Sequence, residues 1–211
     1  MGSASSSVHL APYADKSYQQ FAQGKTPLYP PAPHIDQTWQ IWGCSPGLFG
    51  LAIRATRWFE THRWEPGKEW FSPEYCQWLR EFKGPVYTGG PIPEIKNHVV
   101  YPLQQVEAEF TTFFLNSSLS LMAAIAILEI EQIRAARRTA DPAKLPQWVD
   151  ADEIQKDDND DVIGFWGVDM SASVEYGRQK PGCWFFILQA LDRNIGIYIP
   201  PESDLGCPEP M

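Results

Sequence analysis

Short runs of β-branched and aromatic residues alternate along this chain with stretches whose apolar residues recur at helical spacing. Candidate strands and helices that follow one another in this way favour an α/β fold, in which a largely parallel sheet carries helices on its faces. A chain of 211 residues, 44% of them hydrophobic, is long enough to bury one such core. The sequence therefore predicts a single three-layer α/β domain with a mostly parallel sheet over residues 1–205, followed by a short tail, 206–211.

The positions of the elements follow from local signals. Ser72 and Pro73 place an N-cap residue before a proline at the first helical position, which predicts a helix over 73–82. The longest helical pattern runs from Ser117 to Arg138, and basic residues at its end complement the helix dipole. The other expected elements are strands at 39–42, 56–60, 85–88, 98–101, 162–167 and 195–199 and helices at 102–110 and 181–193.

Residues 139–161 interrupt this alternation with a dense set of carboxylates and two prolines, Pro142 and Pro146. The spacing of the acidic residues does not match a calcium-binding loop, which needs alternating ligands around a central glycine. Charged, proline-containing segments of this kind are typically solvated. The sequence predicts that 139–161 is an acidic surface insertion, exposed and partly mobile.

Charge and cysteine usage exclude several classes of protein. The net charge of −9 argues against a duplex nucleic-acid partner, because such proteins need a clustered excess of Lys and Arg, although backbone amides could still hold a small anionic ligand. The chain shows no signal peptide, and polar residues interrupt its most apolar stretch, 113–133, so no membrane partner is expected. Widely spaced cysteines without a metal-ligand pattern indicate reduced thiols in a cytoplasmic protein: Cys44, Cys76, Cys183 and Cys207.

One candidate site follows the apolar run that begins at Val162 and stops at Gly167. Ligands of α/β proteins bind just beyond the carboxyl ends of parallel strands, which is where Asp169 would lie. A dense series of hydrogen-bonding side chains continues after it and makes a pocket wall plausible. The alternative is that Gly167 and Asp169 only turn the chain and cap a helix.

A second candidate site follows the strand predicted at 56–60. His62 and Arg63 lie directly beyond this strand, so an imidazole, a guanidinium and two carboxylates, those of Glu60 and Glu65, occur within six residues. Such a set is suited to acid/base work or to binding an anion. Because side chains alternate along a strand, Glu60 and His62 should share one side. The alternative is that His62 bonds a loop carbonyl and Arg63 stacks on Trp64. The candidate catalytic residues are His62, Arg63 and Asp169.

Five short segments together resemble a family of small, uncharacterised bacteriophage proteins, and the resemblance covers nearly the whole chain apart from the insertion. They are residues 2–6, 41–44, 114–118, 164–169 and 196–200. More distantly, they are similar to the Rossmann-like group that includes the bacterial single-domain sialyltransferases and proteins of unknown function related to archaeal pterin pyrophosphokinases. The resemblance implies a Rossmann-like fold, nucleotide chemistry and a protein acting in the cytoplasm of an infected bacterial host.

The resemblance also implies which residues touch the ligand. The loop 2–6 would wrap a phosphate with its backbone amides, as the glycine-serine loop after the first strand of those enzymes does. The segments at 43–45 and 116–118 would reach the same nucleotide, and Gly167 with Asp169 would lie beside its base and ribose. Two polar residues from the stretch after Asp169, Tyr176 and Arg178, are added as candidate ligand contacts. The expected ligand-binding set is then Gly2, Ser3, Ser5, Gly43, Ser45, Asn116, Ser117, Ser118, Gly167, Tyr176 and Arg178. For 116–118 the alternative is simple helix capping.

The chain departs from that group in two ways. The sialyltransferases carry a histidine base ahead of the final helix, whereas residues 175–180 contain no histidine, so their mechanism does not carry over. The phosphate loop also begins at residue 2, where a central strand should precede it. The first strand of the sheet is therefore expected to be truncated or missing, and the alternative is a true start codon upstream of Met1.

Three functions remain open on this evidence. The first is a nucleotide- or nucleotide-sugar-dependent transferase with its ligand at the carboxyl ends of the strands. The second is a non-catalytic protein that binds a nucleotide-like metabolite and blunts a host defence, and the third is a virion structural or assembly protein. The first two functions imply a small nucleotide-like ligand. A homo-oligomer is compatible with each of the three functions.

Overall fold

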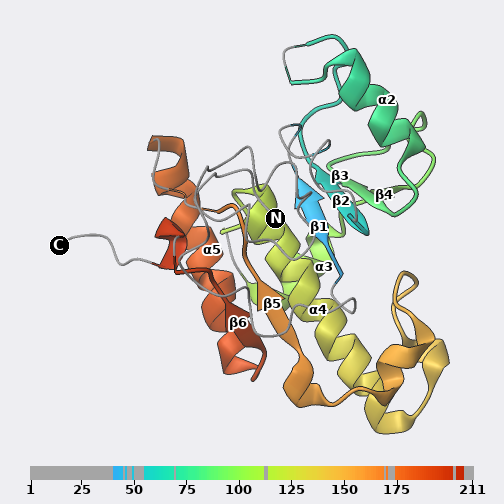
Figure 1. Cartoon of the computed structure of the whole chain (residues 1–211), viewed down its shortest axis with the longest axis vertical. Coiled ribbons are helices and arrows are strands. Elements are labelled where there is room, and N and C mark those ends of the chain that lie inside the picture. Colours follow the sequence, from blue (N-terminus) through green and yellow to red (C-terminus); the bar gives the residue numbers. More distant parts are fainter. Residues whose placement is uncertain are drawn as a thin grey trace, which may run out of the picture. The chain divides into compact units, whose positions relative to one another are not determined.

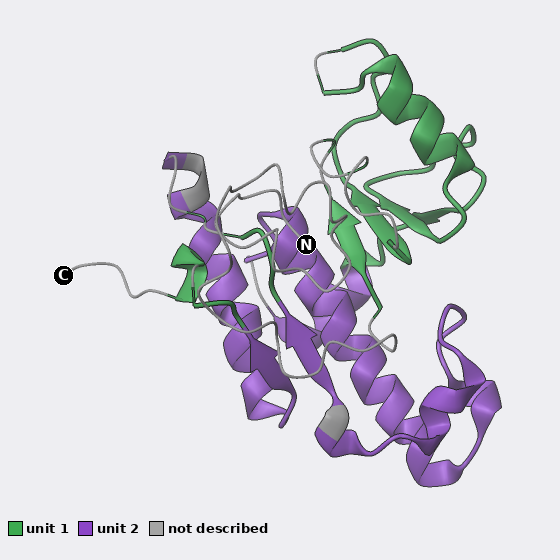
Figure 2. Cartoon of the chain, viewed as in Figure 1, with its two compact units in different colours: residues 1–103, 165–173, 199–211 green, residues 104–164, 174–198 purple. Residues whose placement is uncertain are grey.

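The computed structural model describes residues 40–44, 46, 49, 55–68, 70–111, 114–168, 170, 174–201 and 203–206. The chain divides into two compact units (Figure 2). Unit 1 comprises residues 1–103, 165–173 and 199–211, and unit 2 comprises residues 104–164 and 174–198. Both units contain strands and helices, so the protein is of the mixed α/β class that the alternating pattern predicts.

Unit 1 contains a four-stranded sheet (Figure 1). Its strands are β1 (Trp42–Cys44), β2 (Arg57–Glu60), β3 (Val86–Thr88) and β4 (His98–Val100). They lie side by side in sequence order, and every neighbouring pair is parallel. All four residues of β2 are buried, as expected for an interior strand of a parallel sheet. The strands predicted near 56–60, 85–88 and 98–101 are confirmed, whereas the first described strand starts at Trp42 and runs on to Cys44.

Helix α2 (Pro73–Glu81) confirms the helix predicted from its start signal. The Ser72 hydroxyl accepts a hydrogen bond from the Tyr75 backbone N–H at 3.2 Å, and Pro73 occupies the first turn. The helix packs on the sheet through Trp58, whose ring meets that of Trp78 edge-on at 4.5 Å. A Cβ at Gly43, the residue paired with Trp58 on β1, would lie 2.3 Å from the Trp58 ring, so this packing requires glycine.

Unit 2 is built around two long helices. They are α4 (Ser118–Thr139) and α5 (Val174–Asp192). The unit also contains α3 (Leu103–Phe110) apart from its first residue, and two parallel strands, β5 (Val162–Gly164) and β6 (Gly196–Tyr198). Phe110 and Phe186 meet edge-on at 5.1 Å in its core. The helices at 102–110 and 117–138 and the strand near 196 are thus confirmed. The strand predicted at 162–167 is shorter and ends at Gly164. Within the described ranges, no helix is both long enough and apolar enough to span a membrane.

Helix α5 begins seven residues earlier than the sequence predicts. Pro181 marks the predicted start because proline favours the first turn, but it lies inside the helix. Proline in a helix interior removes one backbone hydrogen bond. Buried residues on both sides, Lys180 before it and Cys183, Phe186 and Ile187 after it, pack this helix into the unit. Tertiary packing therefore overrides the local start signal.

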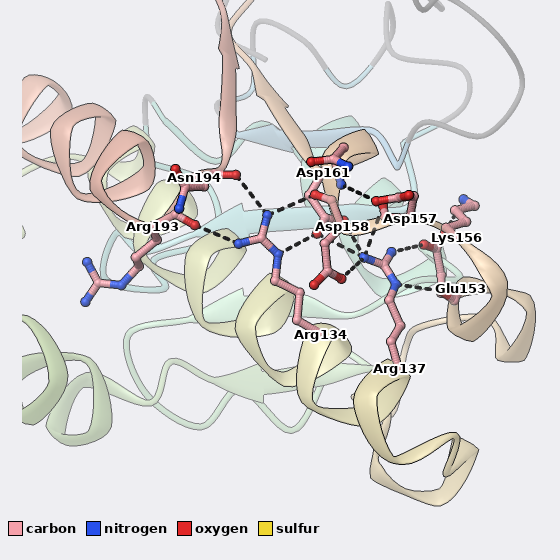
Figure 3. Close-up of polar contacts among 10 residues, drawn as sticks. Arg134, Arg137, Glu153, Lys156, Asp157, Asp158, Asp161, Arg193 and Asn194 are labelled. Atoms are coloured by element: carbon pink, nitrogen blue, oxygen red, sulfur yellow. Dashed lines mark hydrogen bonds and ion pairs between the residues drawn. The ribbon is translucent and has the colours of Figure 1, made fainter.

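The acidic segment 139–161 is not the loose loop that its composition predicts. It folds into three 3₁₀ helices: η3 (Pro142–Lys144), η4 (Ala151–Gln155) and η5 (Asp158–Asp160). Arg137 of α4, whose side chain is only 7% exposed, lies with Nη1 3.0 Å from both Asp158 Oδ1 and Asp161 Oδ2 (Figure 3). Its Nε donates to the Glu153 carbonyl at 2.9 Å. The carboxylates of the segment are thus bound to the long helix.

Arg134 extends this arginine–carboxylate cluster to the end of α5 (Figure 3). Its Nε donates to Asp161 Oδ2 at 2.8 Å, and its Nη1 and Nη2 donate to the carbonyls of Arg193 and Asn194 at 2.7 and 2.9 Å. A second bond from Nη2 reaches the Asp158 carbonyl at 3.0 Å. Besides complementing the helix dipole, the two arginines therefore connect α4, η5 and the residues after α5.

Candidate functional site

A buried carboxylate and a half-exposed imidazole meet at the carboxyl end of β2. Glu60 is the last residue of this strand and is 1% exposed, whereas the His62 side chain is 50% exposed. His62 Nδ1 lies 2.6 Å from Glu60 Oε1, and the His62 backbone N–H donates to the same oxygen at 3.1 Å. Strand alternation predicts that these two residues share one side, and the structure joins them as a carboxylate–imidazole pair.

The hydrogen bonds around Glu60 decide which histidine nitrogen carries the proton. Glu60 Oε2 accepts a bond from the Tyr75 hydroxyl at 2.7 Å, and Oε1 accepts from the His62 backbone. When Glu60 is a carboxylate, which can only accept hydrogen bonds, Nδ1 of His62 is the donor in the 2.6 Å contact. In a neutral imidazole the other nitrogen, Nε2, is then the unprotonated one and is the atom that can accept a proton.

Tyr75 remains a hydrogen-bond donor over a wide pH range. Burial raises the pKa of its phenol well above the ordinary value, and the negative charge of Glu60 and the hydrogen bond to it raise the pKa further. A phenol that does not ionise keeps its proton available for the carboxylate. Tyr75 therefore stays the donor in its bond to Glu60 Oε2.

The exposed side of the pair is lined by an aromatic ring. The centroids of His62 and Trp70 are 4.5 Å apart, and Trp70 is itself 42% exposed. The imidazole is thus open to solvent on one side while its Nδ1 is bound to a buried carboxylate. Imidazoles held in this way act as general bases, which take a proton from a hydroxyl group or from water during the reaction.

Arg63, the third polar residue of this segment, extends into solvent. Its side chain is 90% exposed, and its Nε lies 3.5 Å from Glu65 Oε1 in a surface pair of the kind that contributes little to stability. The cation that stacks on Trp64 is Arg80, at 5.7 Å, which corrects the alternative of an Arg63–Trp64 contact. The nitrogen Nδ1 of His62 bonds Glu60, and the other alternative, a bond from His62 to a loop carbonyl, stays a prediction for its second nitrogen.

The structure describes two other predicted site residues of unit 1, Gly43 and Gly167, and neither takes part in the pair of Glu60 and His62. Gly43 makes room for the Trp58 ring, as described above. Gly167 is buried and has φ of 69°, a left-handed conformation that favours glycine, and the next carbonyl, that of Val168, accepts a bond from the buried Ser203 hydroxyl. The other predicted residues of this part of the chain lie outside the described residues: Gly2, Ser3, Ser5, Ser45 and Asp169.

The predicted ligand residues of unit 2 take part in a helix junction. Ser117 is the N-cap of α4, and its hydroxyl accepts from the Ser120 backbone N–H at 3.1 Å, so the capping alternative is confirmed for this residue. Ser118 is the first residue of the helix. Asn116 Nδ2 donates to the Arg178 carbonyl of α5 at 2.8 Å. Tyr176 lies in the first turn of α5, and its side chain is outside the description.

Sequence reasoning missed two members of the site. It placed Glu60 beside His62 but did not count the carboxylate among the catalytic candidates, because strand alternation shows a shared side and not a bond. It also missed Tyr75, which is separated from Glu60 by the whole β2–α2 connection. The signal available was the helical spacing of Tyr75 and Leu79, which predicts that the tyrosine faces the sheet.

Comparison of this chain with models of protein families, with curated proteins and with solved structures finds no match.

Proposed function

We propose that this protein is a transferase in which His62 is the general base. Nε2 of His62 would remove the proton from an acceptor hydroxyl, and Glu60 would stabilise the imidazolium that forms. The observation that carries the proposal is the 2.6 Å contact between His62 Nδ1 and the buried carboxylate of Glu60, at the end of an interior strand of a parallel sheet.

The donor substrate that we propose is a nucleotide or a nucleotide sugar. This part of the proposal comes from the sequence resemblance to Rossmann-like phage proteins and sialyltransferases, together with the parallel pairing of all described strands. The carboxyl ends of such strands are the usual place for nucleotides, and His62 follows one of them. The setting would be the cytoplasm of a bacterium infected by a phage.

The experiment is a turnover assay on a panel of nucleotide sugars with an acceptor alcohol in excess, in which release of the nucleotide is measured. A positioned general base contributes roughly 10²- to 10⁴-fold to a rate, so His62→Gln should lower kcat by at least about a hundredfold. Glu60→Gln should also lower kcat, because it removes the charge that stabilises the imidazolium.

His98→Gln is the matched control for this assay. His98 lies in the same sheet, and its Nδ1 is 3.0 Å from the Ile95 carbonyl instead of a carboxylate. Its substitution should leave turnover within about twofold of the parent. The proposal is overturned if the parent releases no nucleotide from any member of the panel, or if His62→Gln turns over as fast as the parent. Tight binding of an intact nucleotide with no turnover would favour the non-catalytic binding protein.

A further inference from the structure

We infer that Tyr75 is a positioning residue for the base: its hydroxyl holds the Glu60 carboxylate in the orientation that presents Oε1 to His62. This inference rests on the proposed function, because it assigns Tyr75 a role through the pair of Glu60 and His62. It adds a buried residue of α2 to a site otherwise formed by β2 and the residues after it.

The bonds that lead to the base have a fixed direction. Trp58 Nε1 donates to the Tyr75 hydroxyl oxygen at 2.8 Å, and an indole N–H can only donate. The Tyr75 oxygen therefore accepts from Trp58, and its own proton points to Glu60 Oε2 at 2.7 Å. Bonds that polarise one another in a buried series of this kind are stronger than isolated ones. Because Oε2 is held in this way, Oε1 stays in place for His62 Nδ1.

The fold fixes each member of this series. Trp58 and Glu60 are two residues apart on β2, so they point to the same face of the sheet, the face on which Tyr75 lies. All three residues are no more than 1% exposed, which keeps competing water away. Tyr75 sits in the first turn of α2, where the Ser72 cap binds its backbone N–H. The phenol therefore has little freedom to move, and its raised pKa keeps it protonated.

Tyr75→Phe tests this role, because it removes one oxygen atom and keeps the ring. If Tyr75 positions the base, kcat should fall by about tenfold while KM stays unchanged, since the variant alters an interaction that acts in the reaction and not in substrate binding. Tyr101→Phe is the control: Tyr101 is also buried in unit 1, but its electrostatic neighbour is Tyr87, on the other face of the sheet from Glu60. It should leave kcat within about twofold of the parent.

A proton spectrum gives a second measurement that does not need turnover. A short bond between Nδ1–H and a carboxylate produces a strongly downfield proton resonance, which is expected in the parent and should vanish in Glu60→Gln. In Tyr75→Phe it should broaden, because a more mobile carboxylate lets the proton exchange with water. If Tyr75→Phe does not fold, 3-fluorotyrosine incorporated at position 75 keeps the bond but makes it a stronger donor, and the resonance should then shift.

The outcomes separate the two proposals. A parent protein without the downfield resonance contradicts the carboxylate–imidazole pair, and with it the proposed function. If the parent shows the resonance, the positioning role of Tyr75 can be overturned while the proposed function stands. This is the outcome if Tyr75→Phe leaves both the resonance and kcat unchanged, or if the fluorotyrosine protein shows no shift of the resonance.

Discussion

Arg137 is a largely buried cation that binds two carboxylates of a strongly acidic chain, those of Asp158 and Asp161. Burial alone lowers the pKa of its guanidinium, but the hydrogen bond to Asp158 and the charge of Asp161 raise the pKa above the usual value. Arg137 is therefore charged wherever the protein is folded. Its partner Asp161 is 9% exposed at the side chain, so the pair is largely shielded from water and salt.

Replacing Arg137 by Met should lower the free energy of unfolding by roughly 1–3 kcal/mol, because the Glu153 carbonyl and Asp158 lose their bonds to Arg137 and Asp161 keeps only its bond to Arg134. Denaturant titration measures this change. Arg138→Met is the matched control, since Arg138 is the next residue of α4 and is exposed; its effect should stay within about 0.5 kcal/mol. Equal effects of the two substitutions would show that the arginine–carboxylate cluster contributes nothing beyond a surface pair.

At the scale of elements, two glycines of α5 should respond to alanine in opposite directions. A Cβ at Gly182 would lie 2.5 Å from both Asn116 Oδ1 and the Phe114 carbonyl oxygen, whereas a Cβ at Gly177 would meet nothing within 4 Å. Gly182→Ala should therefore destabilise the protein by roughly 1–3 kcal/mol through overpacking. Gly177→Ala should stabilise it by about 0.5–1 kcal/mol, because alanine favours the helix. Thermal unfolding of the two variants, compared at equal concentration, checks both signs.

The sequence predicts those elements whose signals are local. Ser72-Pro73 identifies the start of α2, and the periodic apolar residues identify α4, because capping and periodicity act within a few residues. The start of α5 and the attachment of 139–161 to α4 are missed, since the packing around Pro181 and the bonds from Arg137 join parts of the chain that are separated in sequence. The same distinction holds for the site, where alternation predicts the shared side of Glu60 and His62 but not the bond from Tyr75.

At the scale of the whole molecule, one buried thiol reports on each unit. Cys44 lies in β1 of unit 1, where burial raises the pKa of its thiol, and Cys183 lies in α5 of unit 2 and is fully buried. Neither should react with an alkylating reagent until its own unit opens. Pulsed alkylation along a urea gradient, with the modified cysteines identified by mass spectrometry, gives a midpoint for each unit.

Arg137→Met should lower the midpoint for Cys183 and leave that for Cys44 in place, because the arginine–carboxylate cluster lies wholly in unit 2. The expectation rests on the two units having separate cores. Equal shifts at both cysteines would show instead that the units unfold as one cooperative block.

The division of the chain also sets the order in which the protein can mature on the ribosome. Unit 1 is made of three separated segments, and its last described contacts include the bond from Ser203 to the Val168 carbonyl. When β6 has just been translated, every residue of unit 2 exists, but residues 199–206 of unit 1 do not. All four strands of the sheet that holds Glu60 are therefore synthesised early, whereas unit 1 is completed late. The nascent chain carries its proposed base for most of translation before the surrounding unit can close.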